Sequence, residues 1–185
     1  NTEVEKFLVD NNYFKIYNIN RFENIERKIA ELLSNNNVVA RVKSSCEFGA
    51  RSLGNRSILA NPSNMESFFK VNDQIKVRDF WMPFAPSILY EFQHKYIKNN
   101  KSIDAEYMIL GFDTHPLAYD HLKAAMHQGD KTVRPQLVKK SKNPSYHQLI
   151  SYFHEITGIA AVMNTSLNIH GYPLAGTLEQ ALFTF

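Results

Sequence analysis

The chain has 185 residues, of which 44% are hydrophobic, so it is long and apolar enough for one compact domain with its own core. Its net charge of +3 suits an anionic ligand but is far from the basic blocks of a nucleic-acid-binding tail. The single cysteine, Cys46, excludes an intrachain disulfide and a cysteine-rich zinc site, and the lack of a long apolar run or a secretory signal favours a cytoplasmic domain without a membrane span.

The first half of the chain shows strand and helix patterns in turn. Apolar and polar residues alternate over Tyr13–Ile19, which predicts a strand. A helix is expected from a cap at Asn20 to about Asn36, because apolar residues recur there at helical spacing. Val38–Lys43 has the composition of the next strand, and the capping box Ser63-x-x-Glu66 predicts a short helix.

The second half continues this alternation. Extended segments are expected at Pro83–Leu89, Tyr107–Phe112 (buried), Lys131–Val138 and Ile159–Met163. Asn143-Pro144 starts a helix and Gly158 stops it, and its apolar face is lined by Tyr146, Leu149, Ile150, Phe153 and Ile156. Thr177-x-x-Gln180 opens a last helix, within which the chain ends, so we expect a truncated C-terminus. Alternating strands and helices predict an α/β (α+β) domain.

The first candidate binding segment is Glu47–Ala60, which is rich in glycine and arginine. Its glycines allow positive φ angles and close backbone approach, so exposed N–H groups there can form an anion-binding nest. Arg51 and Arg56 add planar donors that match phosphate oxygens, and Asn55 lies between them. The alternative is a solvated loop with two surface arginines.

Two further segments place polar groups on one face of an extended chain. If Lys76 and Arg78 lie in an extended segment, they share a face because strands have a period of two residues, and two cations on one face can grip a polyphosphate. In the same way Thr132, Arg134 and Gln136 present a hydroxyl, a guanidinium and an amide. The alternatives are a charged strand edge and an ordinary exposed strand face.

The fourth segment, Asn164–Pro173, follows a buried strand directly. A polar loop at the carboxyl end of a strand is a common ligand site, although an ordinary Asx turn explains the same residues. The candidate contacts are Asn164, Thr165, Ser166 and Asn168. The seven histidines show no metal-ligand spacing, and neither a Walker loop nor a nucleophile elbow occurs, so no metal site is assigned.

Taken in order, these four segments resemble the C-terminal domain of the O-carbamoyltransferase family, which includes nodulation and antibiotic carbamoyltransferases. Residues 47–60 follow the family pattern E-F-G-P-R-A-L-G-N-R-S-I-L-A with Ala50 for Pro and Ser52 for Ala. The K-x-R, P-F-A-P-S, R-x-Q and N-T-S-x-N elements follow at Lys76, Pro83, Arg134 and Asn164, so the likeness spans roughly residues 38 to 181.

The resemblance implies a YrdC-like fold over residues 1–185, a twisted mixed sheet with flanking helices and a basic concave ligand face. It implies that the domain binds ATP, with Mg²⁺ on the nucleotide, and carbamoyl phosphate, and forms carbamoyl-adenylate. An N-terminal actin-like-fold domain, which is absent from this chain, would then pass the carbamoyl group to a hydroxyl acceptor.

By the same resemblance, the working residues are cations and polar clamps, since joining two anions needs charge neutralisation and positioning. Lys76, Arg78 and Arg134 are expected to grip phosphate or carbamoyl oxygens, and Arg51, Asn55, Arg56, Asn164, Thr165, Ser166 and Asn168 to hold nucleotide and substrate. The family's Gly-Arg pair is Ser44-Ser45 here, and its Arg before P-F-A-P is Met82. Arg41 and Lys43 are the candidates to replace these cations.

Two other functions remain open. YrdC-like relatives act in tRNA modification, so an RNA-binding module is one alternative, although no basic-aromatic interleaving supports it. The other is a catalytically silent domain that only docks onto its N-terminal partner.

Overall fold

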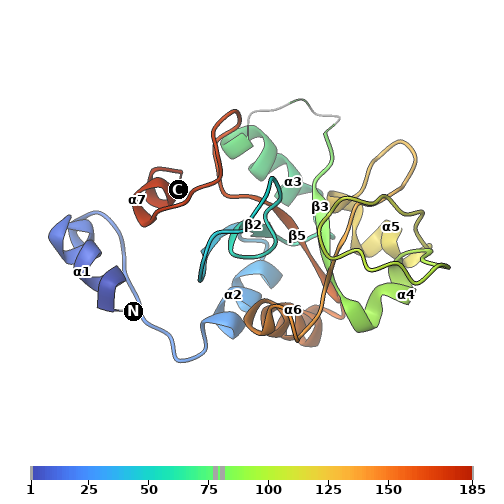
Figure 1. Cartoon of the computed structure of the whole chain (residues 1–185), viewed down its shortest axis with the longest axis horizontal. Coiled ribbons are helices and arrows are strands. Elements are labelled where there is room, and N and C mark those ends of the chain that lie inside the picture. Colours follow the sequence, from blue (N-terminus) through green and yellow to red (C-terminus); the bar gives the residue numbers. More distant parts are fainter. Residues whose placement is uncertain (1, 77–78, 80–81, 185) are drawn as a thin grey trace.

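A computed structural model describes residues 2–76, 79 and 82–184 and contains a five-stranded sheet flanked by helices (Figure 1). The strand order is β1-β2-β5-β3-β4. The strands are β1 (Val39–Val42), β2 (Arg56–Ala60), β3 (Ala85–Leu89), β4 (Gln136–Val138) and β5 (Ala161–Ser166).

The register of the sheet brings distant segments to one edge. β5 is antiparallel to both of its neighbours, with Ser166 opposite Ser57 of β2 and Asn164 opposite Ala85 of β3. β3 is parallel to β4, with Ser87 opposite Gln136. The carboxyl end of β5 therefore meets the amino ends of β2, β3 and β4. The described parts of all four candidate binding segments adjoin this edge.

Helices α2 (Ile25–Ser34) and α6 (Pro144–Thr157) lie side by side along one face of the sheet (Figure 1). The predicted boundaries of α6 are confirmed. The Asn143 side chain accepts a hydrogen bond from the N–H of Tyr146, and Gly158 ends the helix at φ 77°.

Both faces of the sheet are covered by apolar side chains. Consecutive strand residues point to opposite faces, so Leu59 enters the core beneath α2 and α6, whereas Ile58 enters a second core with α3 (Met65–Val71). The larger core includes Leu33, Ile88, Leu149, Phe153 and Val162, and the second includes Phe68, Val71, Phe84 and Met163.

The remaining elements are short. They are α1 (Thr2–Asp10), η1 (Tyr13–Lys15), the π-helical turn η2 (Asn72–Lys76), η3 (Tyr90–Phe92), α4 (Gln93–Tyr96), α5 (Leu117–His121), η4 (Lys123–Ala125) and α7 (Leu178–Thr184). The predicted last helix is thus present, and the Thr177 hydroxyl accepts from the N–H of Gln180 at its start. In the described ranges, no helix is long and apolar enough to cross a membrane.

Several predicted elements differ from the structure at the N-terminal side. The strand expected over Tyr13–Ile19 is wrong, because this stretch forms the single turn η1 and no neighbouring strand pairs with it within the described residues. The second helix starts at Ile25 with Asn24 as its cap, not at Asn20. Asn64, not Ser63, caps α3.

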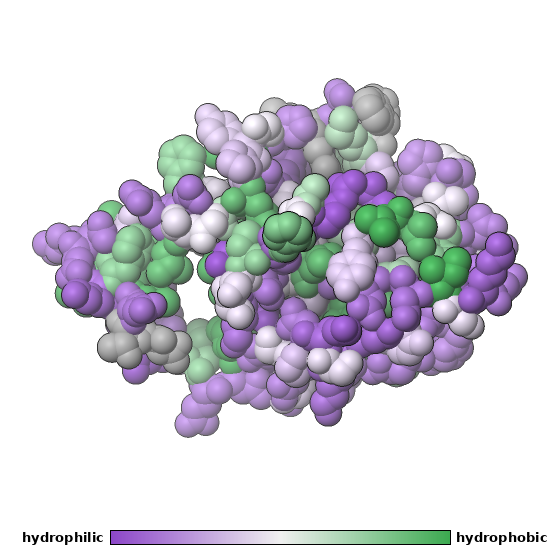
Figure 2. Space-filling model, in the orientation of Figure 1, coloured by the Kyte–Doolittle hydropathy of each residue, from purple (hydrophilic) through white to green (hydrophobic). Residues whose placement is uncertain are grey.

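The buried strand expected over Tyr107–Phe112 is also wrong. Only an isolated bridge joins Phe112 to Val133, and Ile109 is 69% exposed. Figure 2 shows hydrophobic side chains at the surface over the loops on the right of the molecule. In the segment Lys131–Val138, regular strand structure begins only at Gln136.

Candidate functional site

A small cavity of about 80 Å³ lies at the sheet edge where the carboxyl end of β5 meets its neighbours. Five residues predicted for the site line it: Arg51, Arg134, Asn164, Thr165 and Ser166. A larger cavity of about 440 Å³ shares the two arginines and the Pro83–Ala85 segment with it. The strand register thus brings together residues that are up to 115 positions apart (166 minus 51).

Among the described residues, Arg51 and Arg134 are the arginines that line both cavities. Partial burial lowers the pKa of Arg134, and the positive charge of Arg51 lowers it further. Within the part of the chain that the structure describes, neither guanidinium makes an ion pair or a hydrogen bond. Two like charges that form no ion pair with a described residue attract an anion.

A second cluster joins three of the predicted residues next to the small cavity. The Lys76 side chain is only 3% exposed, and its ammonium group contacts Ser166 and Asn168. It lies 3.2 Å from the Ser166 hydroxyl, 2.6 Å from Oδ1 of Asn168 and 2.8 Å from the carbonyl oxygen of Asn168. Ser166 belongs to both the cluster and the cavity wall, so the two parts form one site.

Asn164 anchors the centre of the site. It is 1% exposed, and its amide nitrogen donates to the Ser52 carbonyl oxygen and to the Ser87 hydroxyl, each at 3.1 Å. The Ser52 carbonyl oxygen is an obligate acceptor, so it fixes the orientation of the amide. Oδ1 of Asn164 is buried and has no hydrogen-bond partner among the described residues. Asn164 lines the small cavity, and a buried acceptor without a partner costs free energy until a donor satisfies it.

The loop between β1 and β2 is closed by its own carboxylate. Oε1 of Glu47 accepts from the N–H groups of Leu53 and Asn55, at 2.7 Å each, and of Arg56 at 3.2 Å. The expectation that these N–H groups are open to an external anion is therefore wrong, because an internal anion occupies them. The loop is instead held in shape by the Glu47 carboxylate, and it carries Arg51.

Asn55 and Arg56 are engaged within the chain. The Arg56 guanidinium donates to the carbonyl oxygens of Lys43, at 3.0 Å, and Asn55, at 3.1 Å. The Asn55 side chain donates to the Ser45 carbonyl oxygen at 3.0 Å and accepts from Asn143 at 3.2 Å. Both side chains brace the loop, and their contribution to ligand binding stays a prediction.

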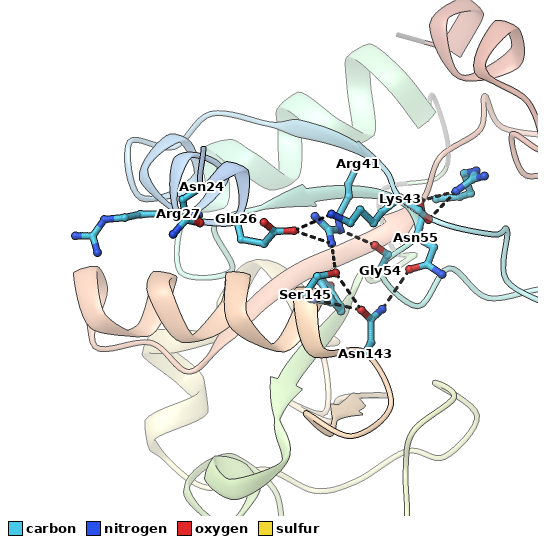
Figure 3. A network of polar contacts seen from close by, with 11 residues as sticks. Asn24, Glu26, Arg27, Arg41, Lys43, Gly54, Asn55, Asn143 and Ser145 are labelled. Atoms are coloured by element: carbon cyan, nitrogen blue, oxygen red, sulfur yellow. Dashed lines mark hydrogen bonds and ion pairs between the residues drawn. The ribbon is translucent and has the colours of Figure 1, made fainter. Parts of the chain in front are cut away.

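Arg41 ties the same loop to α2 and α6 (Figure 3). Its side chain donates to the Gly54 carbonyl oxygen at 2.8 Å and the Ser145 hydroxyl at 2.9 Å, and it lies 3.7 Å from Glu26. Burial lowers the pKa of Arg41, while Glu26 opposes this effect. Lys43 also pairs with Glu26, at 3.3 Å. Arg41 therefore cannot replace the cations of the family pattern, since it is buried and committed to structural contacts.

Other site residues divide into those outside the described ranges and those that the sequence did not reveal. Arg78, predicted to grip phosphate, lies outside the described residues. The missed residues come mostly from loops: Ser52 and Met108 at the small cavity, and Met82, His127 and Asp130 at the larger one. Thr132 also lines the larger cavity, and its spacing from Arg134 had indicated it. Among the described residues no group of three His, Cys, Asp or Glu is placed to hold a metal ion.

Comparison with known sequences gives a consistent result. Residues 30–185 match the family model for the carbamoyltransferase C-terminus. The chain is 40% identical over 156 residues to the uncharacterized protein MJ1058 of Methanocaldococcus jannaschii, covering 84% of this chain and 25% of that protein. It is 32% identical over 169 residues to nodulation protein NolNO of Sinorhizobium fredii, covering 90% of this chain and 25% of that protein. It is 33% identical over 144 residues to the 3'-hydroxymethylcephem-O-carbamoyltransferase of Amycolatopsis lactamdurans, covering 78% of this chain and 26% of that protein. The chain spans about a quarter of the length of these relatives.

Solved structures share the fold at low sequence identity. Full-length HypF in its phosphate- and nucleotide-bound form matches with a TM-score of 0.61 at 18% identity, covering 91% of this chain and 20% of HypF. Sua5 of P. abyssi complexed with L-threonine matches with a TM-score of 0.64 at 15% identity, covering 89% of this chain and 45% of Sua5. These likenesses confirm the expected YrdC-like fold.

Proposed function

The chain belongs to the carbamoyltransferase C-terminal family, and we propose that it activates a carbamoyl group by binding ATP and carbamoyl phosphate and joining carbamate to AMP. The observation that carries this proposal is the convergence of Arg51 and Arg134, which form no ion pair with a described residue, on one pair of cavities. ATP and carbamoyl phosphate are both polyanions. Their close approach requires cations at this point.

The dimensions and polarity of the small cavity support a carbamoyl-sized group. Its volume of about 80 Å³ admits a few heavy atoms, whereas the larger cavity of about 440 Å³ leaves room for more of the nucleotide. Carbamate has two N–H donors and two oxygens. The unpartnered Oδ1 of Asn164 suits the donors, and the arginines suit the oxygens.

The proposed chemistry has two steps. Water cleaves the phosphoryl group from carbamoyl phosphate, which gives carbamate and inorganic phosphate. A carbamate oxygen then attacks the α-phosphorus of ATP, the bond to pyrophosphate breaks, and carbamoyl-adenylate remains. Mg²⁺ bound to the nucleotide would offset phosphate charge. The arginines would hold the two anions in line, and the Lys76 cluster would fix the Ser166–Asn168 loop beside them.

The second half of the reaction would belong to another domain. The chain matches about a quarter of each relative named above, so other parts of such enzymes have room for the acceptor site. We propose that an N-terminal actin-like-fold domain takes the carbamoyl group from the adenylate and passes it to a hydroxyl acceptor.

The test is calorimetric titration of MgATP into this chain and into Arg134→Ala, followed by pyrophosphate release in the presence of carbamoyl phosphate. Arg27→Ala is the matched control, because Arg27 is an exposed arginine on α2 that lines neither cavity. We expect saturable binding by the wild-type and control chains, a loss of about tenfold or more in Arg134→Ala, and pyrophosphate release that requires carbamoyl phosphate. A folded wild-type chain that does not bind MgATP would contradict the proposal and favour a docking domain.

A further inference from the structure

The turn formed by residues 127–132 borders the larger cavity. Two backbone hydrogen bonds close this turn, from the His127 N–H to the Thr132 carbonyl oxygen at 2.9 Å and from the Lys131 N–H to the His127 carbonyl oxygen at 3.0 Å. The turn brings the side chains of His127, Asp130 and Thr132 to the wall that Arg51 and Arg134 also line.

The carboxylate of Asp130 holds the other two side chains in place. Its Oδ1 accepts from the N–H of Thr132 at 2.9 Å and from the Thr132 hydroxyl at 2.8 Å, and it lies 2.9 Å from Nδ1 of His127. The backbone N–H and the hydroxyl of Thr132 are the main donors that lower the pKa of Asp130, and His127 adds to them. Asp130 is therefore an ionised acceptor near neutral pH.

An ionised acceptor determines which ring nitrogen of His127 carries a proton. Nδ1 must donate to the carboxylate, since a carboxylate has no proton to give. The N–H of Asp130 also approaches Nδ1, but at 3.3 Å and without a charge, so the contact with the carboxylate dominates. Nε2 remains, and no described residue forms a hydrogen bond with it.

We propose that His127, oriented by Asp130, is a ligand-contacting residue that binds a phosphate group in the larger cavity through Nε2. Resting on the proposed function, this inference adds a third contact to the two arginines. The cavity volume of about 440 Å³ leaves room for such a group next to them. Nε2 can donate to a phosphate oxygen when the ring carries two protons, or accept from a phosphate hydroxyl. The phosphate belongs either to carbamoyl phosphate or to the terminal phosphates of ATP.

The test separates the two ring nitrogens by substitution. In His127→Asn the amide reaches the position of Nδ1, which keeps the Asp130 contact but removes Nε2. In His127→Gln the amide reaches the position of Nε2. The matched control is His147→Asn, because His147 pairs with Glu91 at the same 2.9 Å distance but lines neither cavity. Dissociation constants for inorganic phosphate, carbamoyl phosphate, pyrophosphate, AMP and MgATP are measured by calorimetry, and melting temperatures are measured alongside.

We expect His127→Asn to bind about tenfold more weakly at an unchanged melting temperature, His127→Gln to recover part of the affinity, and His147→Asn to bind like the wild type. A loss confined to phosphate and carbamoyl phosphate assigns the contact to the carbamoyl donor. A loss confined to pyrophosphate and MgATP, with AMP unchanged, assigns it to the nucleotide. Wild-type affinity of His127→Asn for every ligand would overturn this inference alone. A wild-type chain that binds none of them would overturn the proposed function as well.

Discussion

The Lys76 ammonium group lies 2.6 Å from Oδ1 of Asn168 and 2.8 Å from the carbonyl oxygen of the same residue. An ammonium group has three hydrogens to donate. The oxygens of Ser166 and Asn168 that surround the Lys76 ammonium group accept them. Lys76 is therefore a positioning residue for the loop after β5. Direct contact with phosphate stays a prediction.

This arrangement predicts the effect of Lys76→Met. Loss of the ammonium leaves partly buried oxygens without their charged donor, so we expect a loss of about 2 kcal/mol in the free energy of unfolding, measured by urea denaturation. Binding of MgATP should weaken in parallel, because Ser166 and Asn168 lose their fixed position. Lys70→Met is the control, since Lys70 is exposed on α3. A variant that keeps full stability but loses binding would show that Lys76 acts as a direct clamp.

Gly54 shows how closely the loop packs on α6. Its φ is 108°, and a Cβ atom there would lie 2.6 Å from Cγ of the buried Tyr146. Gly49 has a similar φ of 115° but open space around a Cβ atom. We therefore expect Gly49→Ala to lower the free energy of unfolding by about 1 kcal/mol, from backbone strain alone. Gly54→Ala should lower it by at least about 2 kcal/mol more. Equal unfolding free energies for the two variants would contradict the close packing.

Local signals explain which elements were predicted correctly. Asn143, Pro144 and Gly158 act within their own turns, so the sequence alone places both ends of α6. The alternation of apolar and polar residues over Tyr13–Ile19 does not show whether a partner strand lies beside this segment. In the folded chain the side chain of Ile16 is 68% exposed. Periodicity describes one segment, whereas a strand needs a neighbour.

The same reasoning applies to the site. The motifs indicated five residues that line the small cavity, because those residues act through their own side chains. The motifs did not predict that Glu47 fills the backbone nest or that Arg41 is bound to Glu26, Gly54 and Ser145, since these contacts depend on tertiary structure. Charge alone does not distinguish a structural arginine from a binding one.

Tyr146 is expected to make the free energy of unfolding fall at alkaline pH. Burial raises the pKa of its phenol above the ordinary value of 10.0. The neutral phenol thus stabilises the fold fully below about pH 10, and this contribution is lost as pH rises from there toward the folded-state pKa, by up to about 1.4 kcal/mol per pH unit. Tyr146→Phe should show a smaller fall in unfolding free energy between pH 9 and 11 than the wild type. Tyr119→Phe, at an exposed position, should fall like the wild type, and identical slopes for all three would contradict the prediction.

Arg51 and Arg134 make the site responsive to anions. They face the same cavities and form no ion pair with a described residue, so their repulsion disfavours the ligand-free state. An anion that binds the folded chain at ten times its dissociation constant adds about 1.4 kcal/mol of stability. We therefore expect phosphate to raise the melting temperature of the wild type by a few degrees, and Arg51→Ala to lose most of that rise. Arg51→Lys should retain part of it, because a point charge replaces the guanidinium fork. A chloride series at the same ionic strength separates specific binding from screening, since screening alone would raise the melting temperature equally with both salts.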